Sequence, residues 1–396
     1  MQGSSGHPDR EYINSNARLV EVCNRIRQAG RFAFDTEFVM EDRFVPEVCV
    51  VQLATDSLVA VADALEIDDL SPVWSLVSDP DVEVIVHAGM EDLGLCFAQG
   101  GQTPARVFDC QIGSGLVTTS YPLSLSRMLW ELLQVRLTKT QTLTDWRRRP
   151  LTPEQIEYAA EDVVHLVEAR EILGRRLIEL GRGEWMEEEM SRFSEAATYE
   201  RDVTGNAIKL KGARSLDPKG LAVAKELVKA REALAAKYNR PVRAVIRDHL
   251  LVEIARHRWK KASQIKTLRG LNLRAEGIRA LAAAVEQACK SPRESWPVAR
   301  PPDDETAAEA SLSLLTRAVV RAYCDEHSIG FQLVTSKQDS RAFVRSIVRG
   351  VQPDPPSLLE RGWRARTMGA LIRSLLTGEA AIRVVPGTNG PSVTVK

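Results

Sequence analysis

The run Arg31–Glu37, RFAFDTE, decides the fold class, because it is a short apolar segment that ends in two acidic residues. Three further β-rich segments follow it: Val48–Ala54 (VCVVQLA), Leu58–Ala62 and Asp81–His87 (DVEVIVH). Short runs of branched and aromatic residues, bounded by turn residues, predict strands. We therefore expect a sheet in the first half of the chain.

Helices are predicted after these strands. Apolar residues recur at helical spacing over about 89–99, 109–117, 124–133 and a long stretch from Pro153 to about Leu180. Thr152 before Pro153 is a typical helix start, because proline fits the first turn and threonine can cap it. Early strands, later helices and a crossover near residues 82–100 favour a mixed sheet flanked by helices.

The second half of the chain has few strand signals. Residues 210–290 carry Leu, Ala and Val at helical spacing, which is typical of a small helical bundle. Residues 291–305 contain four prolines and predict a linker, and residues 306–380 return to helical spacing. We therefore expect an α/β first half followed by two helical domains, at 210–290 and 306–380.

The net charge of zero over 396 residues hides an asymmetry. Residues 1–200 carry a net charge of −16, whereas residues 210–290 carry +12. An acidic region suits cation binding, and a basic module suits a polyanion such as nucleic acid. Charge alone leaves open a second interpretation, that both modules are merely charged and soluble.

The six cysteines are scattered, and none forms a C-x-x-C pair. A zinc site or a redox dithiol is therefore not expected, and a reducing, cytoplasmic compartment fits best. No run of 18 apolar residues occurs, so no transmembrane helix and no membrane partner are expected. The sequence shows no obvious dimer seam, and we expect a monomer.

Acidic residues from three distant segments could bind metal together. Asp35 and Glu37 share a face of a strand, and a hard divalent cation between them would offset their repulsion. Tyr158 and Asp162 are four apart on a helix, so they also share a face. Asp92 lies in the first turn of a helix, where capping is the alternative role. Asp35 and Glu37 could likewise be a solvated strand end, but four carboxylates together suit two Mg²⁺ ions.

At these residues the chain resembles ribonuclease D, of the DEDDy class of 3′→5′ exonucleases. The resemblance lies in FDTEF (Phe34–Phe38), HAGMEDL (His87–Leu93), YAAEDV (Tyr158–Val163) and the segment Lys139–Ala160. It implies an α/β, ribonuclease H-like (DnaQ-like) exonuclease domain with a mixed sheet at residues 10–195. Gly220–Cys289 and, more distantly, Glu309–Ile329 resemble HRDC domains, so two all-α HRDC-type domains are expected to follow.

The resemblance also implies roles for single residues. It assigns Asp35, Glu37, Asp92 and Asp162 to two divalent ions, Mg²⁺ or Mn²⁺, and Tyr158 to the attacking water. It places RNA near the strand that contains Thr36 and Phe38, and near the loop with Lys139 and Gln141. That loop could equally be an exposed loop without contacts. Arg243 and Arg247, at helical spacing in the basic module, are expected to contact phosphates.

Three neighbouring features have competing interpretations. A base near neutral pH is the tempting role for His87, but we expect it to be structural and bonded to backbone, because Tyr158 already serves the water. We expect Asp109 to be a helix N-cap rather than a fifth metal ligand. The run Arg147–Arg149 is either a phosphate contact or a charged turn.

The expected function is a metal-dependent 3′→5′ exoribonuclease that releases nucleoside 5′-monophosphates. Single-stranded RNA 3′ ends and tRNA precursors are the expected partners, in tRNA 3′ processing and stable RNA maturation. Two alternatives remain at this point. One is a 3′→5′ DNA exonuclease, because the contacts that distinguish the 2′-OH are not visible in a sequence. The other is a catalytically silent RNA-binding scaffold.

Overall fold

The computed structural model describes residues 9–137, 144–200, 202–297, 305–353, 355–385 and 392–395. Its contacts divide the chain into two compact units. The first unit joins residues 1–37, 49–199 and 305–396, and the second joins residues 38–48 and 200–304. The region beyond residue 305 therefore belongs with the N-terminal half.

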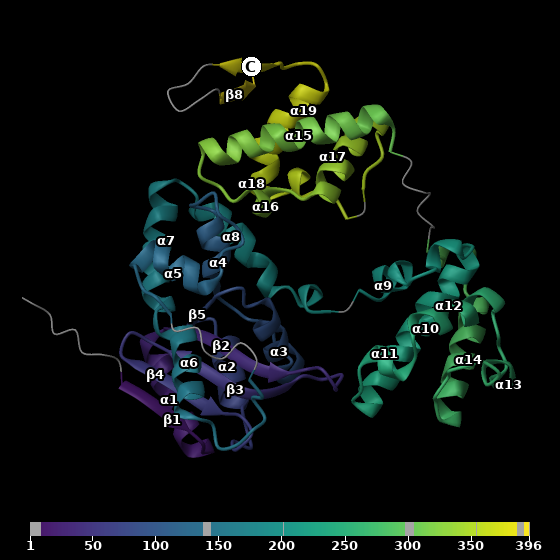
Figure 1. Cartoon of the computed structure of the whole chain (residues 1–396), viewed down its shortest axis with the longest axis horizontal. Coiled ribbons are helices and arrows are strands. Elements are labelled where there is room, and N and C mark those ends of the chain that lie inside the picture. The colour runs from purple at the N-terminus through teal and green to yellow at the C-terminus, as the bar shows by residue number, and fades with distance from the viewer. Residues whose placement is uncertain are drawn as a thin grey trace, which may run out of the picture. The chain divides into compact units, whose positions relative to one another are not determined.

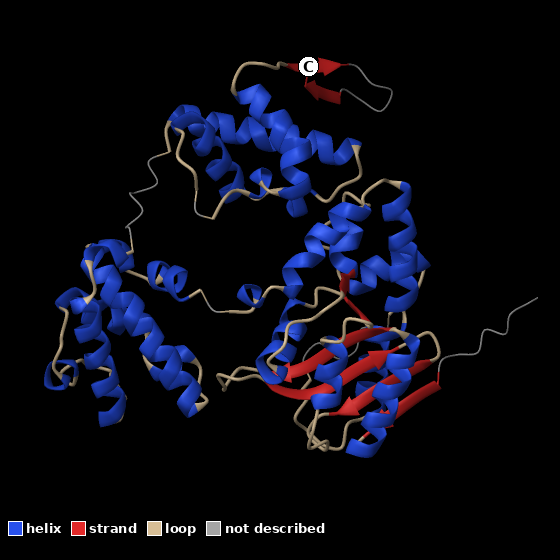
Figure 2. Ribbon diagram, turned by 180° about the vertical axis from the view of Figure 1, so that it is seen from behind, coloured by secondary structure: helices blue, strands red, loops and turns tan. Residues whose placement is uncertain are grey.

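The N-terminal part of the first unit contains a six-stranded mixed sheet (Figures 1 and 2). The strand order is β1-β4-β3-β2-β5-β6. β1 pairs with β4, β2 with β5 and β5 with β6 in parallel, whereas β3 and β4 are antiparallel. The strands are β1 Asp9–Ile13, β2 Arg31–Val39, β3 Glu47–Ala54, β4 Leu58–Asp63, β5 Glu83–Val86 and β6 Val107–Asp109. The predicted mixed α/β sheet is confirmed.

Helices pack around this sheet (Figure 2). α6 packs against β4, α7 against β5 and α4 against β6. The helices are α1 Asn16–Ala29, α2 Ser71–Val77, α3 Met90–Gly100, α4 Cys110–Gly115, α5 Leu125–Leu133, α6 Pro153–Val164, α7 Leu166–Glu179 and α8 Gly183–Ser191. Thr152 and Gln155 form a capping box at the start of α6, as the Thr-Pro start predicts.

The long helix predicted from Pro153 to about Leu180 is two helices. α6 ends at Val164 and α7 begins at Leu166, with His165 between them. The two parts have different partners, because α6 packs against β4 while α7 packs against α4, α5 and β5. Apolar spacing continues through the break, so periodicity alone predicts a single helix.

The second unit is helical in its described part after residue 200. Its helices are α9 Val203–Lys209, α10 Pro218–Tyr238, α11 Val242–Val245, α12 Asp248–His257, α13 Ala262–Ile265 and α14 Ala275–Lys290. Leu227, Leu251 and Val285 are fully buried in its core. The segment 38–48 joins this unit through Phe44, which packs against that core.

The C-terminal region is helical and ends in a small hairpin. Its main elements are α15 Ala307–Glu326, α16 Phe331–Val334, α17 Lys337–Arg349, α18 Gly362–Arg364, α19 Ala370–Leu376, β7 Ile382–Val385 and β8 Ser392–Val395. β7 and β8 pair antiparallel, a feature that the all-helical prediction lacks.

The C-terminal region is packed on the N-terminal half through α8. The indole rings of Trp363 and Trp185 stack at 4.4 Å between centroids, and Arg364 forms a buried ion pair with Glu189 at 2.5 Å. Gly330 N donates to a backbone carbonyl of the α4 region at 2.7 Å. None of the helices in the described ranges is long and apolar enough to cross a bilayer.

Candidate active site

β2 presents two of the predicted acids. Asp35 and Glu37 are partly exposed, whereas Phe34 and Thr36 beside them are buried. Successive strand residues point to opposite faces, so the two carboxylates lie on one face, as the sequence predicts. The buried residues at the start of β2 anchor the strand in the core, which fixes the position of these acids.

α3 supplies the third acid from its first turn. Asp92 is 8% exposed, and its Oδ1 accepts a hydrogen bond from the Thr36 hydroxyl at 2.5 Å. Thr36 thus joins β2 to α3 between the two acids of the strand. The side chain of Thr36 is buried and engaged with Asp92, and its predicted contact with RNA stays a prediction.

α6 supplies the tyrosine and the fourth acid. Tyr158 and Asp162 are partly buried, one helical turn apart. The ring of the buried Trp146 lies against Tyr158, with 6.1 Å between centroids and 39° between planes. Trp146 precedes α6 in the chain, so the phenol of Tyr158 is supported by a residue outside the helix that contains it.

Burial and neighbouring charges raise the pKa values of all five side chains. Burial raises the pKa of Asp35 well above its usual range, and the charges of Asp92, Asp162 and Glu37 raise it further. Burial, then Asp162 and Asp92, raise the pKa of Glu37 to about 8. Burial chiefly raises the pKa of Asp162 to about 7 and also raises that of Asp92. The pKa of Tyr158 rises to about 12 through burial and the nearby acids.

This donor set fits a hard divalent cation. The four carboxylates offer oxygen ligands alone, which Mg²⁺ prefers and Mn²⁺ accepts. Among the described residues, no Lys, Arg or His forms an ion pair with any of the four. Within the same residues, no three His, Cys, Asp or Glu side chains are already arranged around one ion. The structure thus brings the acids into electrostatic range without closing a coordination shell.

Asp109 and His87 brace the second motif. Asp109 accepts from the backbone N–H groups of Gln111 and Ile112, so the predicted N-cap of α4 is confirmed. His87 Nε2 lies 3.1 Å from the Leu123 carbonyl and donates to it, which confirms the predicted bond to backbone. Burial lowers the pKa of His87, so its ring is neutral at physiological pH.

The predicted substrate contacts fall in several places. Lys139 and Gln141 lie outside the described residues. Phe38 is partly buried on β2. In the second unit, Arg243 is exposed and pairs with Asp248 at 3.3 Å, whereas Arg247 is exposed.

Arg149 has a structural role. The sequence alone does not decide whether the run Arg147–Arg149 contacts phosphate or forms a charged turn. Its Nε lies 2.5 Å from the Oδ2 of Asp63, and its Nη2 donates to Asp63 Oδ1 at 2.6 Å. Tyr12 also donates to Asp63, and Arg149 Nη2 reaches the Cys49 carbonyl at 2.9 Å. A guanidinium used in this way ties the segment before α6 to the sheet and is not free for phosphate.

Sequence reasoning missed two supports of the site. The first is the bond from Thr36 to Asp92, which joins residues 56 positions apart. The second is the packing of Trp146 on Tyr158. The sequence does hint at the packing of Trp146 on Tyr158, because both aromatic residues lie in the motif-like segment Lys139–Ala160. Nothing in the sequence pairs Thr36 with Asp92.

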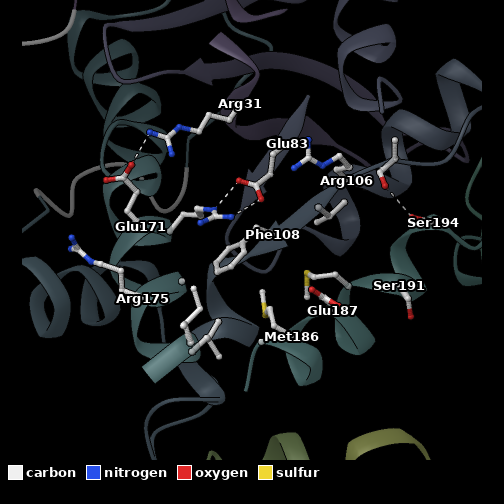
Figure 3. Close-up of a pocket in the computed structure, with 18 residues that line it drawn as sticks. Arg31, Glu83, Arg106, Phe108, Glu171, Arg175, Met186, Glu187, Ser191 and Ser194 are labelled. Atoms are coloured by element: carbon white, nitrogen blue, oxygen red, sulfur yellow. Dashed lines mark hydrogen bonds and ion pairs between the residues drawn. The ribbon is translucent and has the colours of Figure 1, made fainter. Parts of the chain in front are cut away.

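A pocket of about 770 Å³ lies elsewhere in the first unit (Figure 3). Its lining includes Arg31 and Glu83, the first residues of β2 and β5. Several charged side chains of this lining pair with one another. Arg170 forms an ion pair with Glu83 at 2.7 Å, and Arg31 forms one with Glu171 at 2.8 Å. None of the five predicted catalytic residues lines this pocket.

Known families and proteins match most of this chain. Residues 10–178 match the model of a 3′-5′ exonuclease family, and residues 220–275 match the HRDC domain. The chain is 31% identical over 382 residues to ribonuclease D of Nitrobacter hamburgensis, covering 95% of this chain and 98% of that protein. It is also 31% identical over 389 residues to ribonuclease D of Granulibacter bethesdensis, covering 97% and 96%.

Solved structures extend the similarity to the fold. The crystal structure of Escherichia coli RNase D, an exoribonuclease involved in structured RNA processing, matches with a TM-score of 0.77 and 25% identity. That match covers 93% of this chain and 99% of the other. A Bifidobacterium adolescentis protein shares the fold with a TM-score of 0.64. On this evidence the chain belongs to the ribonuclease D family of hydrolases, and it is a 3′→5′ exoribonuclease of that type.

Proposed function

We propose that this chain shortens RNA from the 3′ end with the help of two divalent ions, Mg²⁺ or Mn²⁺. In this proposal Asp35, Glu37, Asp92 and Asp162 hold the ions, and Tyr158 positions the attacking water. The observation that carries it is that side chains from β2, α3 and α6 lie close enough for the charges of Asp92 and Asp162 to raise the pKa values of Asp35 and Glu37. Carboxyl groups whose pKa values are shifted by burial and by neighbouring charges are typical of functional sites.

The metal ions would supply the electrophilic part of the chemistry. When bound, they would lower the pKa of a water molecule and stabilise the negative charge that develops on the leaving 3′ oxygen. The carboxylates contribute the negative charge that makes such binding favourable. Thr36 would support the ligand geometry, because its hydroxyl already holds one oxygen of Asp92.

The protein's own groups would orient the reactants. The phenol of Tyr158 keeps its proton far above neutral pH, so it can hold a water by hydrogen bonding. The water oxygen would bond to the terminal phosphorus while the bond from phosphorus to the 3′ oxygen breaks. The proton lost by the water balances the one gained by the 3′ oxygen. The products would be a nucleoside 5′-monophosphate and RNA one nucleotide shorter.

Residues outside the acid cluster would also bind RNA. The basic charge of residues 210–290 favours phosphate binding, and the HRDC match in this part of the chain supports that role. Arg247 is the better candidate contact, since Arg243 already pairs with Asp248. Thr36 and Phe38 on β2, with Lys139 and Gln141, would bind the terminal nucleotides.

The physiological substrates would be single-stranded RNA 3′ ends and tRNA precursors. The Escherichia coli relative is described as processing structured RNA, which supports this choice. We further propose a monomer that works in the cytoplasm. Its functional parts would be an exonuclease domain at 10–195, an HRDC domain at 210–290 and a second HRDC-like domain at 306–380.

Matched RNA and DNA oligomers with 5′ labels test this function. We expect the RNA with a free 3′-OH to shorten stepwise and to release 5′-monophosphates, with the DNA degraded more slowly. A 3′-phosphorylated RNA serves as the blocked control. Faster loss of DNA would identify a DNA exonuclease instead. Tight RNA binding without product in Mg²⁺ or Mn²⁺, on tRNA precursors as well, would identify a silent scaffold.

A further inference from the structure

We propose that Asp109 is a positioning residue for Asp92. It fixes the turn between β5 and α3, and so holds the Asp92 carboxylate where the divalent ions would bind. This inference rests on the proposed function, because it assumes that Asp92 is a metal ligand. It goes beyond that function by assigning a role to a residue outside the five catalytic side chains.

The sheet puts Asp109 beside this turn. Asp109 is the last residue of β6, and it lies opposite Val86, the last residue of β5, in the parallel pairing of the two strands. Its Oδ1 accepts from the backbone N–H of Ala88 at 3.1 Å, and its Oδ2 accepts from that of Gly89 at 3.3 Å. Its carboxylate therefore holds both residues that lead into α3.

The same carboxylate accepts from two further backbone donors. Oδ1 accepts from Gln111 N at 2.8 Å and from Ile112 N at 3.3 Å, at the start of α4. Oδ1 thus receives three of the four backbone hydrogen bonds, and Oδ2 receives the one from Gly89 N. Asp109 is 2% exposed, so bulk water has little access to its carboxylate. These bonds join the starts of two helices.

The turn needs this support because its backbone is constrained. Ala88 has φ 58°, in the left-handed region that residues with a Cβ seldom adopt. A Cβ added to Gly89 would lie 2.4 Å from the Cβ of Val86, so the turn passes very close to the strand. Gly89 has no side chain to cap α3, and Asp109 supplies acceptors from another strand.

Asp92 lies only three residues after this turn. A change in the turn would therefore move the first turn of α3 and the carboxylate on it. On the other side, Asp92 is held by the Thr36 hydroxyl. Asp92 is thus fixed between β2 and the turn that Asp109 braces, and loss of either support should displace it.

The test compares Asp109→Asn and Asp109→Ala with the wild-type full-length chain. The asparagine keeps the shape but turns one acceptor oxygen into an NH₂ group, which cannot accept from Gly89 N. Binding of Mn²⁺ without RNA is followed by the electron paramagnetic resonance signal of the free ion. We expect Mn²⁺ affinity to fall by roughly ten- to a hundredfold, as is usual when the support of a metal ligand is removed. The KM for RNA at saturating Mn²⁺ should stay close to the wild-type value.

Asp202→Asn is the matched control. Asp202 caps α9 through Gly205 N in the second unit, so the same chemical change is made at a helix cap that does not touch α3. Circular dichroism checks that each variant is folded, and Asp109→Asn decides the question if the alanine variant does not fold. Wild-type Mn²⁺ affinity in a folded Asp109→Asn protein would overturn the inference. If the wild-type chain itself binds no Mn²⁺, the proposed function fails instead.

Discussion

Tyr158 is the residue of the proposed site whose protonation state is most firmly set. Its pKa is raised to about 12 by burial and by the neighbouring acids, so the phenol is neutral wherever the protein is active. A neutral phenol can donate one hydrogen bond and accept another, which is what holding a water requires. Trp146 restricts the ring by packing on it.

Replacing Tyr158 by phenylalanine should therefore lower kcat without removing a metal ligand. We expect a loss of roughly a hundredfold, the lower part of the range for groups that position or transfer protons. The KM for RNA should change little. Titration of tyrosine absorbance at 295 nm should give the same curve for wild type and variant up to about pH 10. Tyr323→Phe, in the C-terminal region, is the control, and an unchanged kcat in Tyr158→Phe would contradict the role.

Asp63 and Arg149 predict a pH dependence of stability. Burial acts to raise the pKa of Asp63, but the hydrogen bonds from Arg149 and Tyr12 outweigh it, and the pKa lies below its usual value. A pKa that is lower in the folded state gives stability above about pH 4, the unfolded value, and this stability is lost as the pH falls further. The wild-type midpoint in urea should therefore drop between about pH 5 and pH 3.

Arg149→Met should remove much of that dependence. It should also lower the free energy of unfolding at pH 7 by about 3 kcal/mol, because it leaves a buried carboxylate without its partner. The neighbouring Arg148, which is exposed, provides the control as Arg148→Met. Equal urea midpoints for the two variants at pH 7 would show that the Asp63–Arg149 pair does not support the fold.

At the scale of elements, the turn from β5 into α3 determines where Asp92 lies. Gly89→Ala would bring a methyl group into contact with Val86, since the added Cβ would lie 2.4 Å from the Val86 Cβ. We expect a loss of about 1–3 kcal/mol in stability, typical of overpacking, and a larger relative loss of nuclease activity. Gly183→Ala is the matched control, because a Cβ there meets nothing within 4 Å. Equal activity of the two folded variants would argue against this view of the turn.

The sequence predicts the elements that carry strong local patterns. β2, β3, β4 and β5 are apolar runs, and their positions agree with the prediction to within a few residues. β1, Asp9–Ile13, was missed because it is largely polar, and β6 because it has three residues. The division between α6 and α7 was missed because it depends on which elements the helices contact, which apolar spacing does not encode.

In the candidate site, too, the sequence predicts the features that carry a local pattern. The acids and Tyr158 could be predicted because they stand at fixed spacings within short motifs. The bond from Thr36 to Asp92 and the double capping by Asp109 could not, because they join residues far apart in sequence. Such contacts depend on strand order, and a single sequence gives no register between β5 and β6.

For the whole molecule, the unexpected feature is the attachment of the C-terminal region. The proline-rich segment 291–305 predicts a tethered third domain, yet residues 305–396 share one compact unit with the exonuclease half. Arg182 on that half donates to the backbone carbonyls of Leu116 and His327, at 2.6 and 2.5 Å. The buried ion pair of Arg364 with Glu189 and the stacked indoles at this contact indicate that the C-terminal region is part of the structural support of the nuclease.

Breaking this contact should destabilise the whole first unit. In Arg364→Met the buried carboxylate of Glu189 would lose its charged partner, and removing one member of a buried pair costs about 3–5 kcal/mol. We expect a lower melting temperature and a single unfolding transition for the first unit. Arg361→Met, at an exposed position three residues away, should melt like the wild type. A melting temperature of Arg364→Met equal to that of Arg361→Met would refute this.

In the proposed function, a metal site of four carboxylates cuts RNA from the 3′ end. The most direct measurement follows 5′-labelled single-stranded RNA with a free 3′-OH in Mg²⁺, in Mn²⁺ and in EDTA. It compares the wild type with Asp162→Asn and with Glu91→Gln, an exposed acid next to Asp92. We predict a ladder that shortens from the 3′ end for the wild type and Glu91→Gln, absent in EDTA and in Asp162→Asn. Undiminished shortening by Asp162→Asn, or by the wild type in EDTA, would contradict the claim.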